Sequence, residues 1–296
     1  MKRSSGLGPV DIFLLVVLLG LAIVALLGAE LFPAEIAGAA APEALPPSTD
    51  HLLGTDELGR DLLRRLLEGM RTTMGVGIGA TILALICGSL YGAFAGLSGR
   101  RTDEIMMRTV DLCFALPYMF LIILLMTFFG QSLLLLFLAI GFVEWMPLSR
   151  IVRAGVHNLR DEPYLEAARM MGGKRLYVLW QHLIPQLGAP LIIYATLMLP
   201  VVMMQEAFLS FLGLGVPPPM ASWGTLIANG VQRIDTAPWI LIASAGSLAV
   251  WLGCLYAAGD RLARSLNLGR STGVTDPSLA AVDLGHLEQR EKGAAE

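Results

Sequence analysis

Charged residues are scarce in this chain of 296 residues, and the scarcity limits what it can be. Lys, Arg, Asp and Glu make up 15% of the sequence, against about 25% in an average soluble domain. Hydrophobic residues make up 55%, which excludes a disordered chain and disfavours an ordinary soluble enzyme. The 21 Lys and Arg against 24 Asp and Glu give a formal charge of -3, so no overall positive charge points to nucleic acid.

Cysteine, histidine and catalytic motifs are equally scarce. The three cysteines lie in apolar stretches without the paired spacing of a disulfide framework or a zinc site, and the four histidines are far apart. Gly172-Gly173-Lys174 lacks the first glycine and the following Ser or Thr of a P-loop. No Ser/His/Asp set and no HExxH motif lies on a plausible scaffold. We therefore expect no metal, no resident cofactor, no ATP binding and no catalysis in this chain.

Long apolar runs are what the sequence has instead. A bilayer core is about 30 Å thick, so a spanning helix needs roughly 20 mostly apolar residues. Six runs approach this length without the period-two alternation of strands, and the fourth extends toward Val152. They predict an all-α integral membrane protein with six transmembrane helices, at about 11–29, 72–97, 105–129, 133–146, 187–204 and 238–258.

The distribution of Lys and Arg predicts the orientation. Lys2 and Arg3 place the N-terminus inside, and the arginines after the second, fourth and sixth runs then also lie inside. Both termini are therefore expected in the cytoplasm, with the chain in a bacterial cytoplasmic membrane. The first run resembles a signal peptide in its flanks, but it exceeds the usual 7–15 apolar residues, so we favour an uncleaved helix. The predicted parts are 1–29, an external loop 30–71, a five-helix core 72–262 with a cytoplasmic loop 153–186, and a tail 263–296.

The cytoplasmic loop 153–186 is too long for a simple connection. Pro163 is suited to a first helical turn, and Gly172 to a helix end. Tyr164, Leu165, Ala168 and Met171 recur at helical spacing between them. This pattern predicts a short amphipathic helix, a sharp turn and a second helical piece that re-enters the membrane. By composition alone, the amphipathic helix could simply lie on the lipid surface.

The loop contains Glu166-Ala167-Ala168, then Gly172, then His182-Leu183-Ile184-Pro185. This spacing resembles the EAA motif of ABC importer permeases. The resemblance implies the ABC type I importer permease fold, and a coupling helix that docks on an ATPase subunit. Two alanines would allow close approach to that partner, and the glutamate would offer it a carboxylate. One departure is a histidine where the general motif prefers an aliphatic residue, although the peptide-permease branch commonly has histidine there. The residues concerned are Glu166, Ala167, Ala168, Gly172, His182 and Pro185.

The external loop carries a second resemblance. Residues 51–71 are similar to the HxxGTDxxGRDxxSRxxxG signature of C-type subunits of dipeptide and oligopeptide permeases, with Arg64 in place of the usual serine. Asp56, Arg60 and Asp61 can close local ion pairs or cap a helix. Residues 61–69 are expected to form an amphipathic helix on the outer face. Two interpretations of these charges stay open: contact with a substrate-binding protein, or a loop that folds on itself.

The segment after the fifth run matches the same subunits from Glu206 to Gly215 and again around Trp223. In this family the fifth helix lines the translocation path, so the resemblance places Met203, Met204, Gln205 and Glu206 beside the cargo. Methionines are flexible and tolerate varied ligands, and a carboxylate can meet a peptide amino terminus. The alternative is that the glutamate pairs within its own chain or with the partner subunit. The family's usual Asp-Pro stop is absent after the sixth run, and the tail has no recognised counterpart.

The resemblance implies a permease subunit of an ATP-driven importer of dipeptides or oligopeptides. Its partners would be a second homologous permease subunit in a heterodimer, two ATPase subunits that carry ATP and Mg²⁺, and an extracytoplasmic substrate-binding protein. Nickel chelates, glutathione or opines are alternative cargoes for the same architecture. A secondary carrier would need inverted repeats and buried charge pairs, and an intramembrane enzyme would need a catalytic dyad; neither is evident. Glycines at 75, 77 and 79 and at 88, 92 and 96 indicate close helix packing.

Overall fold

The computed structural model describes residues 44–159 and 184–265, together with the isolated residues Gly20, Ile23, Glu162 and Met170. Apart from an isolated β-bridge between Thr55 and Asp61, the regular structure of the described ranges is helical, as predicted. In chain order the helices are α2 (Leu62–Leu97), α3 (Arg100–Ala115), α4 (Tyr118–Phe129), α5 (Leu133–Leu159), α8 (Ile184–Phe211), α9 (Trp223–Gln232) and α10 (Pro238–Ser265).

Four helices are long and apolar enough to cross a membrane, namely α2, α5, α8 and α10. They confirm the spans predicted at 72–97, 133–146, 187–204 and 238–258. Helices α3 and α4 make a fifth span if the bent pair is counted as one. The first predicted span, 11–29, lies outside the described residues, so the described part of the chain holds four or five of the six predicted spans.

The predicted span over 105–129 is not one straight helix. It is divided into α3 and α4, whose axes differ by 75°. Pro117 explains the division, because proline lacks the N–H that continues a helix and disfavours helical geometry in the residue before it. Leu116 accordingly has extended backbone angles, φ -82° and ψ 137°. The prediction recognised the apolar run and overlooked the break inside it.

Helix α2 begins at Leu62, so the short outer helix expected at 61–69 continues without a break into the membrane span. Asp61 is the N-cap residue, and its Oδ1 accepts a hydrogen bond of 3.0 Å from the Arg64 backbone N–H. The 36 residues of α2 correspond to about 54 Å at 1.5 Å per residue. This exceeds the bilayer core of about 30 Å, so α2 extends beyond that core.

Glycines bring α2 and α5 into close contact; their spacing predicted close helix packing, and the structure identifies α5 as the partner. A Cβ atom on Gly88 would lie 2.7 Å from the Trp145 carbonyl oxygen, and one on Gly92 would overlap the Ser149 carbonyl oxygen. Only glycine permits this approach of the two backbones. The four-residue spacing of the glycines therefore defines the face of α2 that α5 covers.

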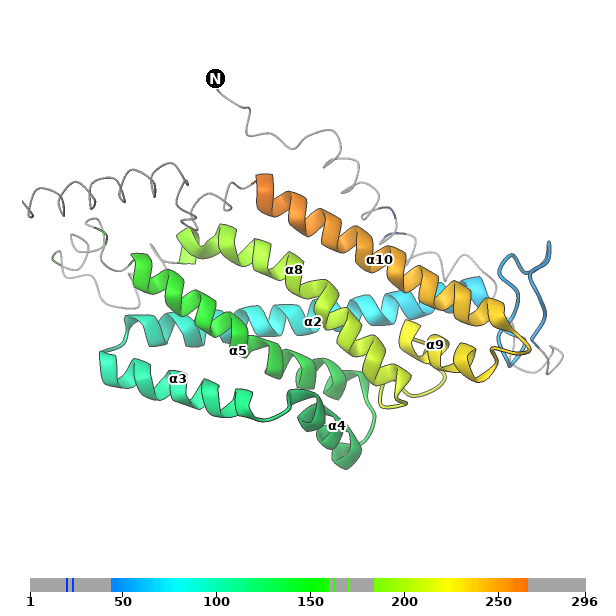
Figure 1. Ribbon diagram of the computed structural model, residues 1–296, viewed down its shortest axis with the longest axis horizontal. Coiled ribbons are helices and arrows are strands. Elements are labelled where there is room, and N and C mark those ends of the chain that lie inside the picture. Colours follow the sequence, from blue (N-terminus) through cyan, green and yellow to red (C-terminus); the bar gives the residue numbers. More distant parts are fainter. Residues whose placement is uncertain are drawn as a thin grey trace, which may run out of the picture.

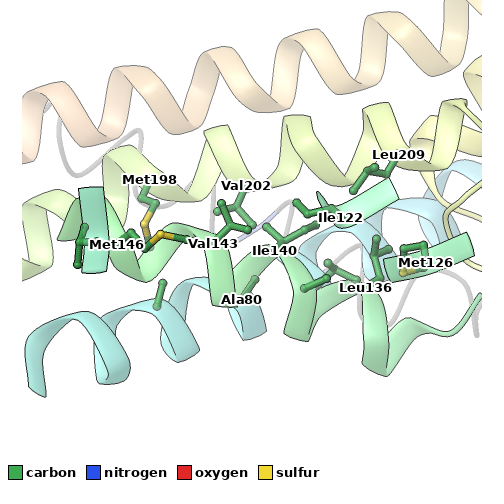
Figure 2. Close-up of a cluster of buried hydrophobic side chains, with 14 residues drawn as sticks. Ala80, Ile122, Met126, Leu136, Ile140, Val143, Met146, Met198, Val202 and Leu209 are labelled. Atoms are coloured by element: carbon green, nitrogen blue, oxygen red, sulfur yellow. The ribbon is translucent and has the colours of Figure 1, made fainter. Parts of the chain in front are cut away.

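Three apolar clusters follow one another along α2, around residues 62–70, 76–84 and 93. Helices α2, α5, α8 and α10 run along the length of the molecule, and α9 lies at one end beside α8 and α10 (Figure 1). We call this end, which also holds residues 44–61, the α9 end. The opposite end holds the start of α3, the end of α5 and the start of α8, and we call it the α3 end. Figure 2 shows the middle cluster, in which α2, α4, α5 and α8 meet through Ala80, Ile122, Met126, Leu136, Ile140, Val143, Met146, Met198, Val202 and Leu209.

Candidate functional site

The predicted outer-loop residues lie at the α9 end, where each takes part in a hydrogen bond or ion pair within the loop. Asp56 is 1% exposed, and its Oδ1 accepts hydrogen bonds of 2.9 Å from the backbone N–H groups of Leu58 and Arg60. Its Oδ2 accepts a third from Arg60 Nε at 2.8 Å. Asp61 Oδ2 lies 3.0 Å from His51 Nδ1. Asp56, Arg60 and Asp61 thus share one folded loop.

Three contacts fasten this loop and the start of α2 to segments more than 150 residues away. Asn229 Nδ2 of α9 donates to Glu57 Oε1 at 2.7 Å. Trp239 Nε1 at the start of α10 donates to the Thr55 carbonyl at 3.4 Å. Arg65 Nη1 donates to the Pro219 carbonyl at 2.9 Å. Gly54, at φ 80°, lies so close to Trp239 that a Cβ would be 2.8 Å from its Nε1. The outer loop is therefore built into the end of the bundle.

The four residues expected on the translocation path differ sharply in exposure. Met203 and Glu206 are 0% exposed and Gln205 is 6% exposed, whereas Met204 is 56% exposed. The difference follows from helical geometry, because consecutive residues of α8 point to different sides. Met204 therefore lies on the open face of α8, and the other three face the inside of the bundle.

Glu206 lies in a polar cluster where α8 meets α2 and the start of α9. Ser210 Oγ donates to Glu206 Oε1 at 2.7 Å. The hydroxyls of Thr73 and Ser222 lie beside the same carboxyl group. Where α8 faces α5, Gln205 Nε2 donates to Glu144 Oε1 at 2.7 Å. The Glu206 contact with Ser210 is of the i, i+4 type and is readable from the sequence, but Gln205 and Glu144 are 61 positions apart and no sequence signal joins them.

The open face of α8 is a continuous apolar stripe. Its large side chains recur at intervals of four, three and four residues, the spacing of one helix face. They are between 37% and 56% exposed, so no described part of this chain covers them fully. The stripe consists of Leu197, Val201, Met204 and Phe208.

At the α3 end, the structure shows the two helices that carry the predicted coupling loop. Helix α5 ends at Leu159 and α8 begins at Ile184. They meet at Gly155, where a Cβ would lie 2.7 Å from Leu187 Cδ2. Pro185 is the second residue of α8 and is exposed. The other predicted coupling residues, Glu166, Ala167, Ala168, Gly172 and His182, lie outside the described residues.

A charged cluster beside that junction was missed by the sequence reasoning. Asp103, in the first turn of α3, accepts from Arg153 Nε at 2.5 Å and from Arg153 Nη2 at 2.6 Å. His157 Nε2 lies 3.2 Å from the same carboxylate. The only sequence signal was an acidic residue in a first helical turn, a favourable position for negative charge. The arginine and histidine belong to α5, some 50 positions further on.

Among the described residues, no group of three or more His, Cys, Asp or Glu side chains is arranged to hold a metal ion. Several of the hydrogen-bonded pairs and ion pairs described above join different helices or join the outer loop to a helix. The open face of α8 is apolar.

Comparison with known proteins gives consistent results. Residues 88–266 match the family described as binding-protein-dependent transport system inner membrane component. The oligopeptide transport system permease protein OppC of Haemophilus influenzae is 41% identical over 217 residues, which are 73% of this chain and 70% of that protein. The dipeptide transport system permease protein DppC of Bacillus subtilis is 37% identical over 226 residues, 76% of this chain and 71% of that protein.

Among solved structures, an inward-facing conformation of the MetNI methionine ABC transporter is similar to this chain. The TM-score is 0.52, and the match covers 69% of this chain and 97% of the other chain. Sequence identity is 17%, so this likeness concerns the fold alone. It agrees with the helical architecture predicted from the sequence.

Proposed function

This chain belongs to the family of binding-protein-dependent transport system inner membrane components, and on that premise we propose that it is the permease subunit of an ATP-driven importer of dipeptides or oligopeptides. Peptides are proposed as the cargo because the chain is 37–41% identical to oligopeptide and dipeptide permeases over about three quarters of its length. As a member of the family, the chain is a multi-pass inner-membrane transport component and not itself an enzyme.

An importer of this class works with ATPase and permease partners. We propose that the partners here are a second, homologous permease subunit, two ATPase subunits that hold ATP and Mg²⁺, and an extracytoplasmic substrate-binding protein. The apolar stripe on α8 supports the first of these, because a second permease subunit would cover it. The α9 end would face outward, and both termini would lie in the cytoplasm.

The loop between α5 and α8 is proposed to couple the ATPase subunits to the membrane helices through Glu166, Ala167, Ala168, Gly172, His182 and Pro185. The packing of Gly155 against Leu187 supports this role. Because the two helices that carry the loop touch each other, a push on the loop reaches α5 and α8 together. ATP can drive the resulting switch only by binding the two states with different affinity.

Residues 203–206 are proposed to line or support the translocation path. Met204 lies on the face of α8 that would meet the second permease subunit, so it would touch cargo that passes between the two subunits, and methionine adapts to varied ligands. Glu206 lies behind this face, in contact with Ser210, and would reach cargo only when the packing of α8 against α9 opens. Asp56, Arg60 and Asp61 would hold the outer loop in the shape that meets the binding protein.

The test is to purify the tagged chain in mild detergent, identify what accompanies it, and reconstitute the complex in vesicles. We expect ATP-hydrolysing subunits, a second permease and ATP-dependent peptide uptake. Gly172→Trp should abolish uptake while ATP hydrolysis continues, because it would disrupt the docking loop. Gly253→Trp is the matched control, since nothing lies within 4 Å of a Cβ there. A folded, inserted chain without partners, or unchanged uptake in Gly172→Trp, would contradict the proposal.

A further inference from the structure

The contact between α3 and α5 at the α3 end bears on how movement of the loop between α5 and α8 is transmitted to the other helices. We propose that Asp103, together with Arg153 and His157, is the positioning set that holds the last turn of α5, so that movement of the loop is transmitted to the bundle. This inference rests on the proposed function. It adds residues that lie outside the coupling motif and on different helices.

The geometry of the contact is that of a strong, directional pair. Both oxygens of Asp103 accept from the Arg153 guanidinium, at 2.5 and 2.6 Å. A bidentate arginine–carboxylate pair fixes orientation as well as distance. The Asp103 side chain is 7% exposed, against 33% for Arg153 and 31% for His157. Solvent therefore screens this carboxylate far less than it would screen a surface charge.

Arg153 and His157 lie close to the end of α5, where the loop to α8 begins. Arg153 and His157 are four residues apart and lie on one face of the helix. His157 is two residues before Leu159, where the helix ends and the loop begins. The last turn of α5 is thus tied directly to the first turn of α3.

The other sides of the same turn are also held. Val156 is 0% exposed, and a Cβ on Gly96 of α2 would lie 2.8 Å from it. Gly155 faces Leu187 of α8. Helices α2 and α8 therefore hold the turn by apolar packing, whereas α3 holds it by charge. Helix ends open more easily than helix centres, so without the Asp103 contact the last turn of α5 could absorb a displacement instead of passing it on.

A second ion pair between the same two helices provides a matched comparison. Arg150 Nη2 donates to Asp111 Oδ1 at 2.6 Å, but the two side chains are 45% and 52% exposed. This pair lies further from the end of α5. Arg150 makes a single hydrogen bond to the Asp111 carboxylate, whereas Arg153 makes two to Asp103. If any ion pair between α3 and α5 were enough for coupling, loss of Asp103 and loss of Asp111 would have the same effect. If coupling depends on the last turn of α5, only loss of Asp103 weakens it.

The experiment uses the complete importer in vesicles and measures peptide uptake and ATP hydrolysis in the same sample. Asp103→Asn should lower the peptide imported per ATP hydrolysed by about fivefold or more, the lower range of coupling between sites. The amount of assembled complex and the rate of ATP hydrolysis should stay as in the unaltered protein. Asp111→Asn should leave the ratio unchanged. The exchange Asp103→Arg with Arg153→Asp should recover part of the lost ratio.

The outcomes separate this inference from the proposed function. An unaltered complex that imports no peptide refutes the proposed function, and this inference with it. Normal uptake per ATP in Asp103→Asn, or an equal fall in Asp111→Asn, refutes the inference alone. If Asp103→Asn does not assemble, Arg153→Lys keeps the charge and loses the bidentate geometry, and its ratio should fall. Failure of both variants to assemble would assign the cluster to folding alone and overturn the inference.

Discussion

At the scale of single residues, Asp56, Asp103 and Glu206 each have at least one hydrogen-bond partner, although Oε2 of Glu206 is buried without one. Burying a carboxylate without hydrogen bonds is costly, and more so in a bundle surrounded by lipid. Asp56 accepts from two backbone N–H groups and an arginine, Asp103 from an arginine, and Glu206 from a serine hydroxyl. Glu206 differs from Asp56 and Asp103 because hydroxyls rather than a cation surround it, so, unlike them, it could pair with a cationic ligand.

Replacement of this carboxylate by an amide tests that role. Glu206→Gln keeps an oxygen that can accept from Ser210, so we expect the complex to assemble normally. Loss of a charge-assisted hydrogen bond costs about 1.5–3 kcal/mol. Uptake of peptides with a free amino terminus should therefore fall roughly tenfold or more, while uptake of acetylated peptides stays unchanged. The measurement is competitive uptake across a panel of both kinds.

Glu144→Gln is the matched control, because Glu144 is also a buried carboxylate on a membrane helix and is paired with Gln205. Glu144→Gln should not discriminate between the two kinds of peptide: uptake of free and acetylated peptides should change by the same factor or not at all. Equal rates for all peptides in Glu206→Gln would show that this carboxylate does not contact the cargo.

At the scale of elements, α9 was not predicted, although its start carries a sequence signal. Gly213, Gly215 and the prolines 217–219 disfavour a helix, and residues 213–219 are not helical. Helix α9 begins directly after Ser222, which forms a capping box with Thr225. A serine followed three residues later by threonine is a weak form of that signature. Helix α9 has only 10 residues and follows a long non-helical segment, so the sequence pattern did not distinguish it from the loop.

Removal of the cap should loosen α9 without unfolding the bundle. The Thr225 backbone N–H donates to Ser222 Oγ at 3.3 Å, and Thr225 Oγ1 accepts from the Ser222 backbone N–H at 2.9 Å. Ser222→Ala removes the first of these bonds and should cost about 1 kcal/mol. Hydrogen exchange in the first turns of α9 should then accelerate roughly fivefold, with α10 unchanged as an internal reference.

Ser222→Thr keeps a hydroxyl cap and is the matched control for that substitution. It should preserve slow exchange in α9 if the hydroxyl is what matters. Equal acceleration in both variants would attribute the effect to packing around residue 222, which is 0% exposed, and would refute the capping explanation.

At the scale of the whole molecule, the two ends of the bundle should face opposite sides of the membrane. In a variant whose three cysteines are replaced, Leu58→Cys and Arg101→Cys introduce single thiols at the α9 end and the α3 end. Both positions are exposed. An impermeant thiol reagent added to intact cells should label the first and not the second, because the arginine distribution places residue 101 inside.

Val76→Cys controls for access through the protein, because Val76 is 0% exposed and a thiol there should react only after denaturation. Labelling of Arg101→Cys in intact cells, with Leu58→Cys protected, would reverse the proposed orientation. Labelling of both would indicate leaky cells and would be resolved by repeating the measurement with sealed inside-out vesicles.

The sequence by itself determined the class of the protein and the approximate position of four membrane helices. Apolar runs of about 20 residues admit few structures in lipid, since backbone groups must be satisfied within the segment. It also determined that one face of α2 packs closely against another helix, because glycines every four residues define one helix face. The Pro117 break could have been read in the same way, since its cause is local.

Only the tertiary structure decided which polar groups meet. Arg153 reaches Asp103 across 50 positions, Gln205 reaches Glu144 across 61, and Arg65 reaches the Pro219 carbonyl across 154. Helical periodicity tells which residues share a face, but the neighbour of that face depends on how all the helices pack together. The same packing placed Met204 outside and Glu206 inside, although they are only two residues apart. Local rules fix the elements, and the sum of many weak apolar contacts selects their partners.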